Sequence, residues 1–515
     1  MLYPKLIISA LWGEDHRLDT SRIAQDYLPG DPDHGKRLMR MTPREAMTGD
    51  HWHSFAWLRD LRTVGGHEAR RTGRQFTRAW RRELLRSPAR TARAFTPQLV
   101  AVRLIYWVSH FEFFWDSAKP IDQKALMRLM VFHSQLLSLP DERALKSQDV
   151  FLYLRAALYI VIMRADGAPW SSSSIALLLT RAIKAQFFAD GGHHSGSVQV
   201  QLSILLHLID IENCMKRLQD PPITLDDSLR HLVSWLRIFV HRNISFADFH
   251  GNACPDFYAK IPRAIVPILI QAYGRGRIMR HAPLSGFARR SAGSLSLVYH
   301  AGKPAGQAHH HHAGSFELMM GRQRIMGNCA ASVAGLTRAW RHALAGASGA
   351  SQLCLEMIEP RIDHLVMTEP DPHQVGSQHD GFVSQTGLRT SRLIELSADG
   401  HELRGTDRLT PITPDAQSHK IMIRFHLDPS IHIHAAHDTY AILQINRRQF
   451  WLFSATGARL SHAPSVYIDN QSTHQQTRQL ILSRFSYAAP LKADTLISWQ
   501  FNRLEPSKAP PDHRS

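Results

Sequence analysis

The chain has few of the features that anchor a protein in a membrane or staple a small fold. Its four cysteines are widely separated and form no CxxC pair, so they require neither a disulfide framework nor a zinc ribbon. No apolar run approaches the roughly 20 residues that cross a bilayer, and we expect no transmembrane segment. A chain of 515 residues without these features is long enough for two or three globular domains.

Acidic residues are scarce relative to basic ones. The sequence has 61 Lys and Arg against 44 Asp and Glu, which gives a net charge of +17. Such a balance favours an acidic partner such as nucleic acid, anionic lipid or acidic polysaccharide. Many of the arginines lie in residues 67–93, where they alternate with Phe76, Trp80 and Leu84 as on an amphipathic helix. No RNA-binding, zinc-finger or P-loop motif accompanies them, so we expect no nucleic-acid partner.

The apolar spacing changes along the chain and predicts two kinds of domain. In residues 50–280 apolar side chains recur every three or four positions between short polar links, which predicts antiparallel helical hairpins arranged as an incomplete α/α toroid. In residues 281–505 short alternating segments end at Gly, Asp, Asn or Pro, which predicts an antiparallel β-sandwich. Residues 1–49 are expected to form an N-terminal arm, and residues 506–515 a disordered tail.

One segment of the second half is typical of a β-hairpin. The string SADGHELRGTDRL, residues 397–409, has an Asp-Gly turn between alternating apolar positions. We interpret Asp407 and Arg408 as surface residues or as members of cross-strand pairs.

Several strings, in a shared order between residues 51 and 487, resemble the heparinase II/III family of polysaccharide lyase-like proteins, and more narrowly its proteobacterial members. They are HSFAWLRDLR, FFADGGHHSGSVQVQL, RNISFADFHGN, HHAGSFELMMGRQRIMGNC, HDGF, RLIELSADGHELRGTDRL and RFHLDP. The resemblance implies β-elimination at a uronic acid of an acidic polysaccharide, and a place in the cell envelope or periplasm. The first sixteen residues lack a convincing signal peptide, so a cytoplasmic location stays open.

The implied chemistry requires three kinds of group. A base removes the C5 proton, a neutralising group acidifies that proton through the adjacent carboxylate, and an acid protonates the departing O4 oxygen. The resemblance gives His193, Asn252 and His310 catalytic roles. It assigns substrate contacts to His194, His250, His309 and Glu317.

Each of these assignments has a plainer alternative. His193 and His194 are also interpretable as turn histidines exposed to water, and Glu317 as a solvated strand residue. The sequence FHGN, which contains His250 and Asn252, has the composition of an ordinary turn.

The sequence departs from the active lyases of the family at two places. The catalytic tyrosine of those lyases has no counterpart, because no tyrosine lies between Tyr159 and Tyr258, and the position of their catalytic histidine is Ala308. Two functions are therefore open: a carbon–oxygen lyase acting on an acidic polysaccharide, or a non-catalytic protein that binds acidic glycan or assists polysaccharide assembly.

The same resemblance bears on metals. It places the zinc ligands of the family at His310, Asn328 and Ala350, and neither Asn328 nor Ala350 is a good zinc ligand. We therefore expect no cofactor and no metal among the site residues, with a structural zinc ion as the less favoured alternative. The sequence gives no indication of an oligomeric state.

Overall fold

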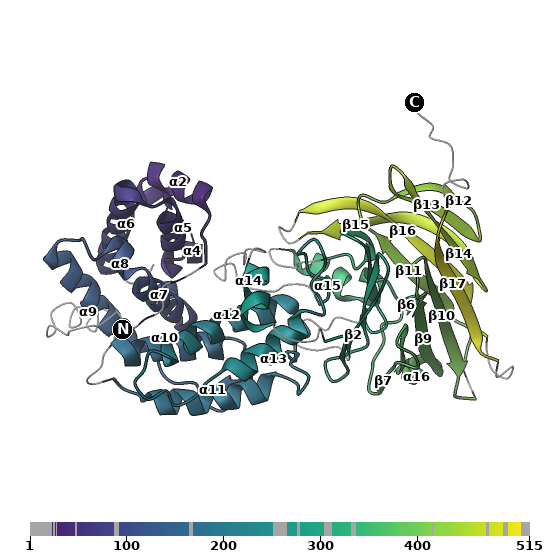
Figure 1. The fold of residues 1–515 in the computed structure, drawn as a ribbon, viewed down its shortest axis with the longest axis horizontal. Coiled ribbons are helices and arrows are strands. Elements are labelled where there is room, and N and C mark those ends of the chain that lie inside the picture. The colour runs from purple at the N-terminus through teal and green to yellow at the C-terminus, as the bar shows by residue number, and fades with distance from the viewer. Residues whose placement is uncertain are drawn as a thin grey trace. The chain divides into compact units, whose positions relative to one another are not determined.

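The computed structural model describes most of the chain (Figure 1). Described are Ile23, Asp26 and residues 28–505 apart from 47–48, 87–91, 164–167, 251–264, 275–278, 303–311, 331–335, 415, 470–472 and 488–492. Most of the predicted N-terminal arm and all of the predicted tail lie outside the described residues. Within them, no helix is both long and apolar enough to cross a membrane.

Helices dominate the first half of the chain. They are α2 (Pro32–Arg40), α3 (Pro43–Ala46), α4 (Gly49–Ser54), α5 (Trp57–Val64), α6 (Gly66–Arg86), α7 (Pro97–Ser109), α8 (Phe111–Phe114), α9 (Pro120–Leu136), α10 (Val150–Met163), α11 (Ser172–Gln186), α12 (Val198–Met215), α13 (Asp226–Leu236) and α14 (Ile265–Tyr273). Helix α7 begins at a Thr96 cap followed by Pro97, two residues that favour a helix start. It packs against α9 and α10, and both α7 and α10 are buried on nearly every side.

Two antiparallel sheets form the second half. The first has the order β1-β2-β3-β4-β5-β11-β16-β15, with β6 also paired to β11, and the second has the order β12-β13-β14-β17-β10-β9-β8-β7. The strands of the first sheet are β1 (His281–Ala282), β2 (Phe287–Ala292), β3 (Leu295–His300), β4 (Phe316–Met320), β5 (Gln323–Gly327), β6 (Leu353–Leu355), β11 (Lys420–Leu427), β15 (Arg459–Ile468) and β16 (His474–Phe485). Those of the second are β7 (Leu365–Thr368), β8 (Gln374–Phe382), β9 (Leu388–Leu396), β10 (Glu402–Pro411), β12 (His432–Ala436), β13 (Tyr440–Asn446), β14 (Gln449–Thr456) and β17 (Thr495–Arg503).

The two sheets pack face to face over one apolar core. Alternate side chains of each strand point inward, as in β9, where every second residue from Leu388 to Leu396 is buried. Phe316 of the first sheet stacks on Trp499 of the second, with ring centroids 5.7 Å apart. The short helices α15 (Arg338–Ala345) and α16 (Val383–Thr386) lie in the connections between strands. The predicted order, helical array and then antiparallel β-sandwich, is confirmed.

The chain forms two compact units that are not divided at a single point. One contains residues 1–186, 202–230 and 255–268, and the other residues 187–201, 231–254 and 269–515. Two segments from the helical half of the sequence thus belong to the unit that contains the sandwich. The predicted domain boundaries at residues 49, 280 and 505 stay predictions.

The predicted hairpin around Gly400 is present, but one of its charged residues points inward. Asp399 and Gly400 form the turn between β9 and β10, and Gly400 has a φ of +71°. Asp407 lies directly opposite Arg392 and is 1% exposed, so the surface interpretation of Asp407 is wrong and the cross-strand interpretation is correct. Arg392 donates from Nε and Nη2 to the two carboxylate oxygens of Asp407 at 2.7 and 3.1 Å, and Trp499 Nε1 donates to Oδ2 at 2.9 Å.

Replacing Asp407 by Ala is expected to destabilise the protein by about 3–5 kcal/mol, because the buried Arg392 guanidinium loses its counter-ion. Urea unfolding followed by circular dichroism measures the change. The matched control is Arg408→Ala on the next position, where the Arg408–Asp494 pair is largely exposed and the change should stay within about 0.5 kcal/mol. Equal effects of the two substitutions would contradict the assignment.

Candidate functional site

The Asp-Gly-Gly-His turn, residues 190–193, is fixed by hydrogen bonds to the side chain of its first residue. The Asp190 carboxylate accepts from Gly192 N at 3.1 Å and from Ser285 N at 2.7 Å. Gly191 has a φ of +87°, and a Cβ there would lie 2.9 Å from the carbonyl oxygen of His231. The turn therefore needs both the acidic side chain and a residue without a side chain.

The two histidines of this turn have different environments. His193 is 7% exposed, and its Nδ1 lies 2.7 Å from Ser195 Oγ. Burial, with a smaller effect of His194, lowers the pKa of His193 to about 3. His194 is exposed beside Phe188, and burial lowers its pKa from the ordinary value. The exposed-turn interpretation therefore holds for His194 and is wrong for His193.

His250 packs against Gly196, three residues after this turn. Gly196 leaves the space that His250 occupies, because a Cβ at Gly196 would lie 2.8 Å from His250 Cδ2. His250 itself has a φ of +57°, a conformation that is unusual for a residue with a side chain and that concentrates at functional sites. Its Nε2 lies 3.0 Å from Nε2 of His300 at the end of β3.

The acceptors around these rings determine where the protons lie. His300 Nδ1 is 3.1 Å from the carbonyl oxygen of His312, which can only accept, so Nδ1 carries a proton. In a neutral His300 the Nε2 atom is then the acceptor, and His250 Nε2 donates to it. His312 Nε2 likewise donates to the carbonyl oxygen of Leu344 at 3.1 Å. His250, His300 and His312, which we call the histidine cluster, thus form a chain with assigned donors and acceptors.

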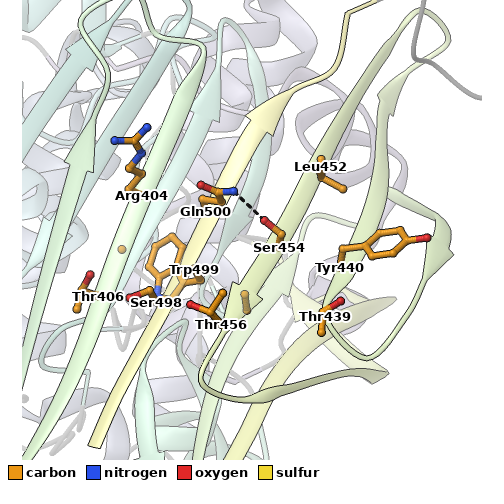
Figure 2. Close-up of a pocket in the computed structure, with 12 residues that line it drawn as sticks. Arg404, Thr406, Thr439, Tyr440, Leu452, Ser454, Thr456, Ser498, Trp499 and Gln500 are labelled. Carbon is orange, nitrogen blue, oxygen red and sulfur yellow. Dashed lines mark hydrogen bonds between the residues drawn. The ribbon is translucent and has the colours of Figure 1, made fainter. Parts of the chain in front are cut away.

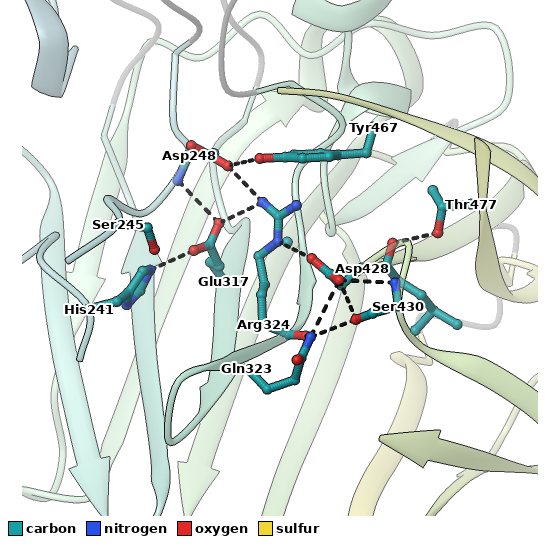
Figure 3. A network of polar contacts seen from close by, with 12 residues as sticks. His241, Ser245, Asp248, Glu317, Gln323, Arg324, Asp428, Ser430, Tyr467 and Thr477 are labelled. Atoms are coloured by element: carbon teal, nitrogen blue, oxygen red, sulfur yellow. Dashed lines mark hydrogen bonds and ion pairs between the residues drawn. The ribbon is translucent and has the colours of Figure 1, made fainter. Parts of the chain in front are cut away.

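A buried network of charged side chains fixes the segment that carries His250 (Figure 3). His241 Nε2 donates to Glu317 Oε1 at 2.6 Å, and the backbone N–H of Asp248 donates to Glu317 Oε2 at 3.1 Å. Arg324 of β5 donates from Nη1 to Asp248 Oδ2 at 2.7 Å and from Nε to Asp428 at 3.0 Å. The solvated interpretation of Glu317 is wrong, because its side chain is 1% exposed.

Tyr467 and Asn328 complete this network. Tyr467 Oη donates to Asp248 Oδ2 at 2.7 Å, and the Arg324 guanidinium lies 3.8 Å above the Tyr467 ring. Asn328 Nδ2 donates to the carbonyl oxygen of Asp248 at 2.7 Å. Asp248 therefore binds side chains of β5, β15 and the loop after β5, which holds residues 241–250 against the first sheet.

The two carboxylates at the centre of the network differ in basicity. Burial, and then the neighbouring Glu317, raises the pKa of Asp248 to about 6. Burial opposes ionisation of Glu317 as well, but the hydrogen bond and charge of His241, with Arg324, lower its pKa below the usual value. We expect Glu317 to carry its charge throughout the physiological range and Asp248 to gain a proton in mild acid.

The structure brings some of the predicted site residues together. His193 and His194 lie just before Gly196, which packs against His250. Glu317 lies on β4, which follows the run of four histidines at residues 309–312, here called the histidine run. Asn252, His309 and His310 lie outside the described residues. The described neighbours of these three in the sequence, His250 and His312, have ring centroids 6.1 Å apart.

The sequence interpretation missed His300, Asp248 and Arg324. Asp248 lies in the string RNISFADFHGN and His300 lies outside the quoted strings, and nothing local marks either of them as a partner. Arg324 is seven residues after Glu317 in a two-stranded hairpin, and this spacing was the available signal. The sequence interpretation gave His312 no role, and its side chain is buried.

A separate hollow lies on the second sheet (Figure 2). It has a volume of about 790 Å³, and its wall includes Arg404, Tyr440, Ser454 and Gln500 from four neighbouring strands. Gln500 Nε2 donates to Ser454 Oγ at 3.0 Å, and Arg404 pairs with Glu402. Hydroxyl, amide and guanidinium groups on a concave wall that also includes Tyr440 and Trp499 are suited to hydrogen-bond a sugar chain.

Comparisons with known proteins agree with this architecture. Residues 274–499 match the family model described as heparinase II/III-like, C-terminal. FtsZ-localized protein C of Caulobacter vibrioides is 24% identical over 379 residues, which cover 67% of this chain. The matched part is 63% of that relative, so the chain spans less than two thirds of its length.

Solved structures show the same fold over nearly the whole chain. A heparinase III structure aligns with a TM-score of 0.71 at 12% identity, covering 99% of this chain and 86% of that one. The heparan sulfate lyase HepC of Pedobacter heparinus aligns with a TM-score of 0.64 at 13% identity, covering 99% and 88%. The family model thus matches the sandwich of this chain, and the solved structures show that nearly the whole chain is similar in fold to heparinase III.

Proposed function

We propose that the protein is a polysaccharide lyase that cleaves an acidic, uronate-containing polysaccharide by β-elimination in the cell envelope or periplasm. The observation that carries the proposal is the meeting of three separate segments at the histidine cluster. Gly196, three residues after the Asp-Gly-Gly-His turn, contacts His250, His250 contacts His300, and His300 contacts the carbonyl oxygen of His312 at the end of the histidine run. These segments contain the residue types that the elimination needs.

The proposed reaction assigns one task to each segment. A histidine of the turn removes the C5 proton, and His194 is better suited than His193 because it is exposed and its Nδ1 is not hydrogen-bonded to Ser195. Asn252 donates to the substrate carboxylate, which stabilises the negative charge that develops. The electron pair forms the C4–C5 double bond as the C4–O4 bond breaks, and His310 protonates O4.

The contacts around Asp248 support this assignment by fixing backbone. Residues 241–250 end two positions before Asn252, and they are tied to the first sheet by Glu317, Arg324, Asn328 and Tyr467. A positioned amide is more effective than a mobile one, because its orientation is established before the substrate binds.

A second candidate is binding of acidic glycan, or help in polysaccharide assembly, without cleavage. Two observations favour it. The sequence lacks the tyrosine of the active lyases of the family, and the hollow on the second sheet offers polar groups suited to a sugar chain. The curated relative is also named for its localisation with FtsZ and not for a reaction.

The lyase proposal predicts that His310→Ala abolishes product formation. The unsaturated uronate product absorbs in the near ultraviolet, so absorbance during incubation with a panel of uronate polymers measures the reaction. The matched control is His311→Ala, the adjacent residue of the same run, which should keep most of the activity. Unchanged turnover by His310→Ala, or equal loss in both variants, would exclude the assigned role.

The positioning role predicts a different result for Arg324→Met. This substitution leaves the carboxylates of Glu317, Asp248 and Asp428 without their shared cation, and we expect it to lower stability by about 3–5 kcal/mol and to reduce elimination in parallel. Chemical unfolding and ultraviolet product formation measure the two effects. The control is Arg322→Ala, an exposed residue of the same hairpin. A stable, fully active Arg324→Met variant would contradict the positioning role.

The binding alternative predicts that Gln500→Ala weakens glycan affinity by about fivefold, because a hydrogen bond to a sugar contributes about 1 kcal/mol. Calorimetric titration with a uronate polymer measures affinity, and binding should weaken as salt screens the basic surface. Gln476→Ala, an exposed glutamine of the other sheet, is the control. Unchanged affinity in Gln500→Ala would remove the hollow from consideration.

A further inference from the structure

Three side chains with metal-binding groups converge in the helical unit, where no role has been assigned. His34 lies on α2, His51 on α4 and Asp60 on α5. Each offers one ligand atom, and the three atoms lie within 4.8 Å of one another. Across the described part of the chain, no other set of three His, Cys, Asp or Glu side chains meets at this spacing.

Two of the three groups are held rigidly by backbone packing. The Asp60 carboxylate accepts from Asp31 N at 2.8 Å through Oδ1 and lies 2.6 Å from His34 Nδ1 through Oδ2. Helix α2 lies directly against α5, because a Cβ at Gly35 would be 2.6 Å from the carbonyl oxygen of Asp60. Asp31 also caps α2 and accepts from His34 N at 3.0 Å. The backbones that carry His34 and Asp60 are therefore held side by side.

His51 is the group that a simple ion pair does not explain. Its ring centroid lies 5.3 Å from that of His34, although the His34–Asp60 pair is complete without it. Two protonated imidazoles at this distance would repel each other. A second imidazole beside a histidine and a carboxylate is an arrangement that binds metal ions.

We propose that His34, His51 and Asp60 bind a divalent transition metal ion, with zinc as the ion that this ligand set fits best. Two imidazole nitrogens and one carboxylate oxygen are common zinc ligands, and water can take the fourth position because His51 lies at the surface. Zinc–nitrogen bonds near 2.0 Å place tetrahedral ligand atoms roughly 3.3 Å apart. His34 Nδ1 and Asp60 Oδ2 lie 2.6 Å apart, so binding needs these two atoms to move apart by about 0.7 Å and the His51 side chain to turn inward.

The proposed ion would connect three helices near the start of the chain. Helix α4 carries His51, and α2 and α5 carry the other two ligands, so the metal would add a link between α4 and the α2–α5 pair. Binding to the folded state alone stabilises it in proportion to the logarithm of the free metal concentration. The site is thus expected to be structural, with no part in the elimination.

Zinc binding to the full-length chain tests the proposal. The parent for the test carries His309→Ala, His310→Ala and His311→Ala, which removes most of the histidine run as a competing weak ligand. Isothermal titration should give one zinc ion per chain, and zinc should raise the Tm of this parent. His51→Ala and Asp60→Asn should each lower the affinity at least tenfold and abolish the rise in Tm, since each removes one ligand. The matched control is His67→Ala, an exposed histidine of the same unit.

The exposed position of His51 makes its variant the decisive one, because its loss should not unfold the protein. Circular dichroism without metal checks that the fold is intact. Zinc binding of equal stoichiometry and affinity in the parent and His51→Ala would overturn the proposal, as would equal losses in His51→Ala and His67→Ala. Failure of the lyase assay has no bearing on this outcome.

Discussion

A single buried guanidinium holds together the part of the molecule in which the candidate site lies. Arg324 contacts Asp248 and Asp428, and it also lies 3.7 Å from Glu317. Three carboxylates out of water would be prohibitively unfavourable without a cation among them, and the Tyr467 ring adds a favourable face for that cation. This charge compensation attaches the segment that ends at His250 to the sandwich, and the Phe249 ring also packs on Phe287. The loop geometry around the histidine cluster therefore depends on an electrostatic balance as well as on apolar packing.

The fold was predictable from the sequence because its signals are local. The spacing of apolar residues in α7 and the alternation in β9 each arise from burial of one or more faces, and a short window shows them. The Asp-Gly turn at Gly400 is local in the same sense. The contacts that define the candidate site are not local, since Asp248 and Arg324 are 76 residues apart. Which charges meet depends on which loops the topology places together, and no periodicity records that.

The buried charges of the sandwich illustrate the same limit. Asp407 alternates correctly for an inward position, yet the sequence left the surface and cross-strand interpretations both open, because burial of a carboxylate is expected only when a partner is known. The partner, Arg392, is fixed by the register of β9 against β10. Similarly, the sequence of the histidine run gave no indication that His312 is buried. The family strings did indicate which segments meet, since three of them converge at His250.

Likeness to the fold of a lyase does not by itself establish the reaction. The fold is carried by the core, whereas proton transfer depends on a few loop residues that change without cost to the core. Here the sequence has no tyrosine between Tyr159 and Tyr258, and the imidazoles of the histidine cluster lie close together. Imidazoles whose pKa is near neutrality exchange protons readily, but burial as deep as that of His193 moves a histidine far from this range. Proton transfer at the site therefore depends on histidines that are exposed, such as His194.

Gly196 has a consequence for related sequences. It has a φ of +64°, and the volume that its side chain would fill is taken by the His250 ring. A methyl group at this position would collide with the imidazole, so residue 196 and residue 250 form a coupled pair, although 54 positions separate them in the sequence. A family member that carries any larger residue at the position of Gly196 has to place a smaller or differently directed group at that of His250. The identity of one glycine thus distinguishes chains that can assemble the His250–His300 contact from chains of the same fold that cannot.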